Sequence, residues 1–347
     1  MTQCKLYFAS DYMEGAHPNI LRRLVETNLE HTTGYGCDEF TLSAKERVRK
    51  ACACPDAAVH FLVGGTQTNA TTIAAILRSY QGVVSVDSGH VTAHEAGAIE
   101  YCGHKVLTLP GKTGKLAADQ IGAYLEAFHA DGKREHSVMP GIVYLSQPTE
   151  YGTLYSLSEL TAISETCRRF RIPLYVDGAR LAYALASPEN DASLADLARL
   201  CDAFYIGGTK CGAFCGEAVV VPDPEIIAHF FTIIKQHGAL MAKGRFLGLQ
   251  FDELFKDDLY MHIGESAVRY AGLIQSELQK NGRRFLFHSP TNQTFLIVDD
   301  SELAPLAEKV EFGFWEKYDE TRSVIRFATS WATTLQDVEA LIALMKE

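Results

Sequence analysis

The stretch Ala203–Val221, AFYIGGTKCGAFCGEAVVV, joins two apolar runs through a glycine-rich connection that contains a single lysine, Lys210. Runs that are apolar at successive positions are typical of strands buried on both faces of a sheet. Lys210 follows the end of the first run, among side chains too small to pair with its ammonium group. It is therefore either a solvated lysine in a turn or a reactive amine held against a ligand.

The same kind of run recurs upstream and defines the fold class. The seven runs cover residues 59–63, 83–87, 105–109, 142–146, 173–177, 203–207 and 217–221. Segments with helical periodicity lie between them: residues 69–80 place Ile73, Ile76 and Leu77 on one stripe, and residues 156–170 open with a capping signal. This alternation predicts an α/β fold with a mainly parallel seven-stranded sheet covered on both sides.

The pattern changes after about residue 245. We expect one long helix from about Phe251 to Lys280, and then antiparallel strands in FLFHSP (285–290) and QTFLIVD (293–299). A further strand, SVIRFATSW (323–331), and a closing amphipathic helix over 333–347 complete a small α+β unit. The predicted division is a large domain with an N-terminal arm over 1–245 and a small C-terminal domain over 246–347.

Composition narrows the class of protein. The 347 residues carry a net charge of −11, which argues against a nucleic-acid partner and against docking on anionic membranes. No apolar run reaches the length of a membrane span, and the N-terminus has no secretory pattern, so we expect a cytoplasmic protein. The nine cysteines lack the paired spacing of zinc sites, which predicts reduced, mostly buried thiols and no metal.

Two of the strand ends carry groups suited to an anion and a cation. Gly64, Gly65 and Thr66 lie between a strand and a helix, so free N–H groups, the helix dipole and a hydroxyl can bind a phosphate. A plain turn with a threonine cap is the alternative there. Asp177 closes the run 173–177, where its carboxylate can hold a cationic ring nitrogen, or can form a surface pair with Arg180.

Histidines follow a third strand end. His90 comes three residues after Asp87, where its imidazole can stack on a planar cofactor or move a proton. For His94, a hydrogen-bonded structural role one turn into a helix is the favoured interpretation. Pyridoxal 5′-phosphate requires four groups together: a lysine, an aspartate, a phosphate-binding helix end and a stacking histidine. In this interpretation Lys210 is the amine that condenses with the cofactor aldehyde.

These motifs resemble the low-specificity L-threonine aldolases of the β-eliminating lyase group, which have the aspartate-aminotransferase-like fold of pyridoxal-phosphate enzymes. The similarity rests on FASDYMEGAHPNI, HTTGYGCD, GGTQTN, the histidine five residues before EAG, VDGAR, GGTKCG and VIRFATSW. It implies a set of cofactor contacts: Gly65, Thr66, His90, Asp177, Arg180, Thr209 and Lys210. It also implies a set of substrate contacts: Ser10 (beside Asp11), Tyr35, Arg180 and Arg326.

One departure from the family pattern concerns catalysis. The family often has T-H-N before a glycine, whereas this chain has PTEYG, which places Glu150 at the histidine position. We therefore take Lys210, His90 and Glu150 as the catalytic candidates, with His90, Glu150 or a water between them as the base for the β-hydroxyl group.

The function that the sequence predicts is cleavage of L-threonine or related β-hydroxy-α-amino acids to glycine and an aldehyde. The alternatives are a β-eliminating lyase or racemase for another amino acid, and a protein that binds the cofactor without catalysis. A P-loop-like nucleotide binder is disfavoured because no Walker sequence is present. The resemblance also implies a homodimer or homotetramer with shared active sites.

Overall fold

The computed structural model describes residues 5–346, and its centre is a seven-stranded sheet with the order β2-β8-β7-β6-β5-β3-β4. All pairs are parallel except those of β8, which runs antiparallel to both β2 and β7. The mainly parallel sheet predicted from the seven runs is confirmed, within three residues at each strand end. The strands are β2 (Ala58–Leu62), β3 (Gln81–Val86), β4 (Val106–Leu109), β5 (Met139–Ser146), β6 (Leu174–Asp177), β7 (Ala203–Gly207) and β8 (Glu217–Val221).

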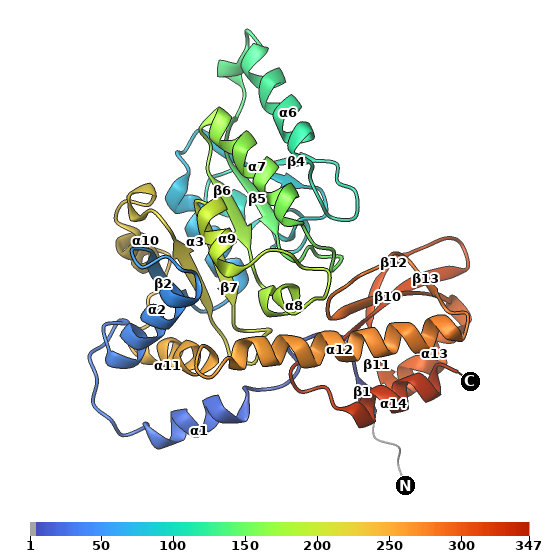
Figure 1. Cartoon of the computed structure of the whole chain (residues 1–347). Coiled ribbons are helices and arrows are strands. Elements are labelled where there is room, and N and C mark those ends of the chain that lie inside the picture. Colours follow the sequence, from blue (N-terminus) through green and yellow to red (C-terminus); the bar gives the residue numbers. More distant parts are fainter. Residues whose placement is uncertain (1–4, 347) are drawn as a thin grey trace.

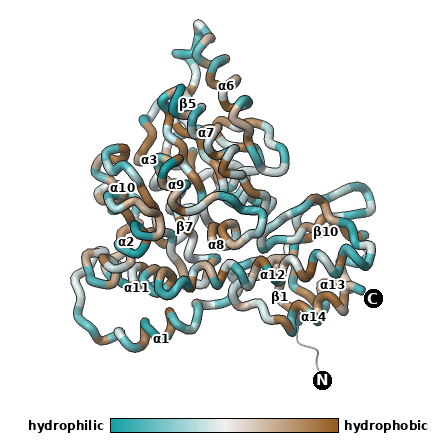
Figure 2. The backbone as a smooth tube through the Cα atoms, in the orientation of Figure 1, coloured by the Kyte–Doolittle hydropathy of each residue, from teal (hydrophilic) through white to brown (hydrophobic). Residues whose placement is uncertain are grey.

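Helices cover both faces of this sheet (Figure 1). Figure 2 shows hydrophobic residues along the central strands β5 and β7, which are buried at nearly every position, as continuous apolar runs require. The helices of this part are α1 (Pro18–Glu26), α2 (Glu39–Ala51), α3 (Gly65–Ile76), α4 (His90–Ala93), α5 (Ala98–Tyr101), α6 (Ala118–Ala130), α7 (Leu157–Phe170), α8 (Leu181–Leu185), α9 (Leu194–Leu200) and α10 (Phe230–Gln236), with 3₁₀ turns at Arg134–His136 and Pro224–Ile226.

The C-terminal part is a four-stranded antiparallel sheet packed against helices. The expected antiparallel strands and closing helix are confirmed, but the single helix predicted over 251–280 is wrong. Two helices replace it, because Asp257 and Asp258 have φ of 50° and 54°, which a right-handed helix cannot contain. The elements are α11 (Arg245–Leu254), α12 (Leu259–Lys280), β9 (Arg284–Phe285), β10 (Gln293–Asp299), α13 (Asp300–Lys309), β11 (Val310–Glu311), β12 (Gly313–Lys317), β13 (Arg322–Ala328) and α14 (Leu335–Leu344).

The N-terminal segment crosses from one part of the molecule to the other. Strand β1 (Leu6–Tyr7) pairs in parallel with β11, and Phe8 packs in the C-terminal core (Figure 1). The next residues run on to the edge of the large sheet, where β2, β3, β6 and β7 end and β8 begins. None of the described helices has the length and apolar character needed to cross a membrane.

Candidate active site

Two strand-end turns pack against each other at this edge, one after β6 and one after β7. A side chain at Gly178 would come within 2.0 Å of the Tyr205 carbonyl oxygen, and one at Gly207 within 2.2 Å of the Ala179 carbonyl oxygen. Only glycine allows this approach. The glycines beside Asp177 and Lys210 therefore bring the two predicted motifs, VDGAR and GGTKCG, into contact.

Asp177 lies at the end of β6 and is 3% exposed. Its Oδ2 accepts hydrogen bonds from the Tyr144 hydroxyl at 2.6 Å and from Asn69 Nδ2 at 2.9 Å, and its Oδ1 accepts from the Ala179 N–H at 3.0 Å. Burial alone would raise its pKa, but the charge of His90 and these side-chain hydrogen bonds outweigh burial and lower the pKa. The group is a buried carboxylate held in its ionised form, ready to pair with a cation.

The Asn69 amide connects this carboxylate to His90. Its Nδ2 also donates to Glu95 Oε1 at 2.7 Å, and its Oδ1 accepts from the Tyr175 hydroxyl at 3.0 Å. Glu95 Oε1 in turn lies 2.6 Å from His90 Nδ1, and this contact, with nearby carboxylates, raises the pKa of His90 against the effect of burial. The result is a continuous buried chain from Asp177 to His90.

The sequence interpretation missed Asn69 and Glu95. Asn69 was visible as the last residue of GGTQTN, one helical turn after Gly65, and Glu95 as the first residue of EAG. Ligand atoms of His90, Glu95 and Asp177 lie within 4.8 Å of one another, a spacing that a metal ion could also use. Because the Asn69 amide already donates to both carboxylates, we interpret the cluster as a hydrogen-bond network.

Helix α3 supplies the predicted anion site. Its N-cap, Gly64, makes no side-chain cap, and a side chain there would meet no atom within 4 Å, so the space in front of the first turn is open. Thr66 is exposed in that first turn, and Gly65 lies against the Tyr205 hydroxyl. Free N–H groups, the positive end of a twelve-residue helix and a hydroxyl converge there, as phosphate binding requires.

Lys210 lies in the β7–β8 connection, partly exposed, at the same edge. A residue that the sequence interpretation missed, Glu217, lies beneath it at the start of β8 and is 3% exposed. Burial raises the pKa of Glu217 to about 8, although Thr209, Lys210 and the Gly208 N–H (3.1 Å) act in the opposite direction. Thr209 Oγ1 also accepts from the Gly216 N–H at 3.0 Å, so Thr209 shapes the lysine turn.

Arg180 is buried and pairs with Asp11 from the N-terminal segment. Its Nε and Nη2 donate to Asp11 Oδ2 and Oδ1 at 2.6 and 3.1 Å, while Nη1 lies 3.8 Å from Glu150 Oε2. Asn292 Nδ2 donates to the same Asp11 oxygen that accepts from Nε, at 2.9 Å. The guanidinium is therefore largely occupied by protein carboxylates, and Glu150 lies beside it.

Arg326 comes from β13 of the C-terminal part. Its Nη1 and Nη2 donate to Gln293 Oε1 at 3.0 Å and to the Ala9 carbonyl at 2.8 Å, and the Trp315 ring lies 5.6 Å from its central carbon. Its buried Nε has no partner among the described residues. Ser10 lies in the chain between Ala9, bound by this arginine, and the aspartate bound by Arg180.

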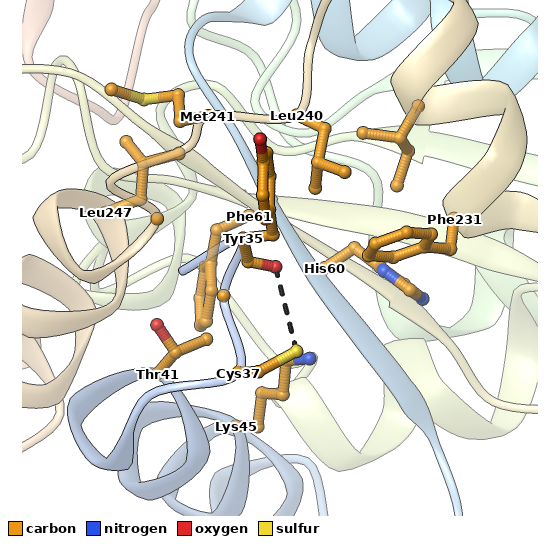
Figure 3. Close-up of a pocket in the computed structure, with 13 residues that line it drawn as sticks. Tyr35, Cys37, Thr41, Lys45, His60, Phe61, Phe231, Leu240, Met241 and Leu247 are labelled. Carbon is orange, nitrogen blue, oxygen red and sulfur yellow. Dashed lines mark hydrogen bonds between the residues drawn. The ribbon is translucent and has the colours of Figure 1, made fainter. Parts of the chain in front are cut away.

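Tyr35 lies apart from this group. It is 45% exposed and lines a separate cavity of about 110 Å³ with Lys45, His60 and Phe231 (Figure 3). Lys235 lies over its ring, 4.5 Å from the centroid. None of the other predicted site residues lines that cavity, so within one chain Tyr35 is separate from them.

The assembled groups fit pyridoxal phosphate. The open first turn of α3 suits the phosphate, and the ionised, buried Asp177 suits a protonated ring nitrogen. His90, with its Nδ1 fixed by Glu95, can cover a ring face, and Lys210 lies in the β7–β8 connection at the same sheet edge. Each requirement is met by a side chain at one sheet edge.

Comparisons with known proteins show the family and the fold of the chain. A model of the β-eliminating lyase family matches residues 7–298. A low-specificity L-threonine aldolase of Pseudomonas aeruginosa is 32% identical, over 98% of this chain and 97% of that protein. The structure of a threonine aldolase from Leishmania major has a TM-score of 0.95 and 39% identity, with 98% of each chain covered. An aspartate aminotransferase from Thermus thermophilus shares the fold, with a TM-score of 0.71 and 13% identity, over 99% of this chain and 91% of that one.

Proposed function

The chain belongs to the β-eliminating lyase family, and we propose that it cleaves L-threonine and related β-hydroxy-α-amino acids to glycine and an aldehyde. The enzyme is a carbon–carbon lyase that depends on pyridoxal phosphate. The observation that carries the proposal is the joint placement of Lys210, the ionised Asp177 and the open first turn of α3 in a chain that matches threonine aldolases over almost its whole length.

Each cofactor contact has a separate task. Gly65 and Thr66 would bind the phosphate, Asp177 would hold the ring nitrogen in its protonated form, His90 would cover the ring, and Lys210 would supply the amine for the cofactor aldehyde. Thr209 fixes the turn that carries the lysine. When bound, the cofactor supplies an electron sink for negative charge that develops on the substrate α-carbon.

Substrate binding falls to the arginines and their neighbours. Arg326 has a buried Nε with no partner within residues 5–346, and this donor suits a substrate carboxylate, with Ser10 beside it. Arg180 holds Asp11 and Glu150 in place and adds positive charge to the same region. The β-hydroxyl proton needs an acceptor, for which His90 and Glu150 are the candidates from sequence.

The deciding experiment is product analysis with the purified holoenzyme. We expect L-threonine to yield equal amounts of glycine and acetaldehyde. The Lys210→Ala variant should lose the visible absorbance of the bound cofactor and at least about a hundredfold in turnover, because the amine that joins the cofactor is gone. Lys280→Ala, which removes an exposed lysine at the end of α12, is the matched control. Pyruvate and ammonia as products, or full activity of Lys210→Ala, would contradict the proposal.

We also propose a cytoplasmic homo-oligomer. Leu21 and Val25 of α1 and Leu29 after it are 49%, 70% and 87% exposed, an apolar row suited to a second copy of the chain. Tyr35, apart from its own chain's site, would then serve a neighbouring one. Sedimentation of a single species at the monomer mass of 38.2 kDa would rule this out.

A further inference from the structure

His94 stands in a row of side chains that runs from the cofactor site to Arg326. The His94 ring centroid lies 5.7 Å from that of His90 and 6.3 Å from that of Trp315, and Trp315 in turn lies against Arg326. The charges of Lys210 and Arg326 both act on His94. A substrate that lies in front of Lys210, with its carboxylate held by Arg326, would be within reach of this imidazole.

The hydrogen-bonded structural role favoured for His94 from sequence is wrong. The residue is the C-cap of the one-turn helix α4, and none of the hydrogen bonds among residues 5–346 involves its ring. Its side chain instead faces solvent and lines a cavity of about 630 Å³ together with Tyr151, Phe287 and Trp315. Both ring nitrogens are therefore available to a ligand.

The two sequence candidates for the proton acceptor are engaged elsewhere. His90 Nδ1 is bound to Glu95 Oε1 at 2.6 Å, which keeps a proton on the ring, and the remaining face is needed for the cofactor. Glu150 Oε2 lies 3.8 Å from Arg180 Nη1, so this carboxylate is already paired with a guanidinium. His94 lies nearby, and its ring has no such hydrogen bond or ion pair among the described residues.

Resting on the proposed function, we propose that His94 accepts the β-hydroxyl proton of the substrate. The proton passes to a ring nitrogen of His94, and the electron pair of the O–H bond forms the carbonyl π bond of the released aldehyde. The Cα–Cβ electron pair stays with the α-carbon, which then takes a proton and leaves as glycine. His94 returns its proton to water through the open cavity.

The surroundings suit a neutral imidazole. Partial burial lowers the pKa of His94; Glu150 opposes this, while the positive charges of His90, Arg326 and Lys210 add to it. Asp87 and Glu316 also line the cavity. A histidine that is neutral near pH 7 can accept a proton, and its protonation at acid pH would stop cleavage.

The test separates carbon–carbon cleavage from the remaining chemistry of the site. His94→Gln keeps a polar side chain but cannot take a proton, and His262→Gln on the exposed face of α12 is the matched control. Each holoenzyme is assayed for L-threonine cleavage across pH, and for exchange of a glycine α-proton in D₂O by NMR. Glycine has no β-hydroxyl group, so its exchange needs Lys210 and the cofactor but no acceptor at the β-position.

We expect His94→Gln to lose about 10²- to 10⁴-fold in kcat for cleavage and to lose the acid limb of its pH profile, while glycine exchange stays within about threefold of the parent. Cleavage that is retained, an unchanged acid limb, or a parallel loss of glycine exchange would each overturn the assignment. Failure of the proposed function looks different: the parent protein would exchange glycine but cleave no β-hydroxy amino acid.

Discussion

Asn69 allows the buried network of the site to be tested quantitatively. Its side chain is fully buried and donates to two carboxylates, Glu95 at 2.7 Å and Asp177 at 2.9 Å. In Asn69→Leu, a side chain of similar size replaces both donors, and each lost hydrogen bond to a charged group costs about 1.5–3 kcal/mol. Both carboxylates keep other partners, Tyr144 and His90, so we expect a loss of about 2–4 kcal/mol in the free energy of unfolding rather than the full sum.

The measurement is urea unfolding at one fixed protein concentration, with equilibrium dialysis for cofactor affinity. Because Asp177 loses a donor to its ionised form, its pKa should rise and cofactor binding should weaken at neutral pH. Thr68→Val is the matched control: Thr68 lies on the same helix, is buried, and its Oγ1 has no partner among the described residues. We compare the loss in unfolding free energy of the two variants. If the loss for Asn69→Leu exceeds that for Thr68→Val by less than about 1 kcal/mol, the network does not hold the carboxylates as described.

Two further predictions concern the ends of the chain. Asp11→Asn should destabilise the protein by about 3–5 kcal/mol at pH 7, because the buried Arg180 loses its partner. Burial would raise the pKa of Asp11, but Arg180, Lys210 and Asn292 outweigh burial and lower this pKa from 3.8 to about 2. The ionised Asp11 therefore stabilises the fold above pH 4, and this stabilisation disappears as the pH falls towards 2. Unfolding of parent and variant between pH 7 and 3 checks this, and a gap that widens in acid would contradict it. Arg326→Lys keeps the positive charge but loses the planar guanidinium group that can bind a carboxylate through two N–H donors. We expect KM for L-threonine to rise at least about tenfold in steady-state kinetics, while the absorbance of the bound cofactor stays unchanged. An unchanged KM would show that Arg326 does not bind the substrate.

The sheet was predictable because strands that are buried on both faces have continuous runs of apolar residues in the sequence. Runs such as 203–207 and 217–221 contain no polar residue except Glu217, so their boundaries in the structure match the expected ones. The antiparallel direction of β8 was not predictable, because an apolar run reads the same in either direction. The end of one helix and the start of the next near Asp257 were missed for a related reason. A change in the backbone angle φ does not alter the spacing of apolar residues along the sequence.

Site residues at or just after a strand end could be predicted from the sequence. Residues whose role depends on contacts between distant parts of the chain could not. Asp177 closes a run, Lys210 and His90 follow runs, and all three could be placed at one edge from their position alone. The Asn69 amide bonds to Glu95, 26 residues away in the sequence, and to Asp177, 108 residues away. No local sequence pattern encodes such contacts. Glu217 looked like the edge of a strand, and its burial beneath Lys210 depends on the pairing of β8 with β7.

The pairing of Asp11 with Arg180 and Asn292 has a consequence for biosynthesis. The segment that carries Asp11 leaves the ribosome long before Asn292 and the strand that pairs with residues 6–7. During translation Asp11 therefore remains unpaired until Arg180, 169 residues behind it, and Asn292, 281 residues behind it, have been made. A nascent chain is thus unable to load its cofactor in the finished geometry, and a chaperone that shields these first residues should raise the yield of competent enzyme.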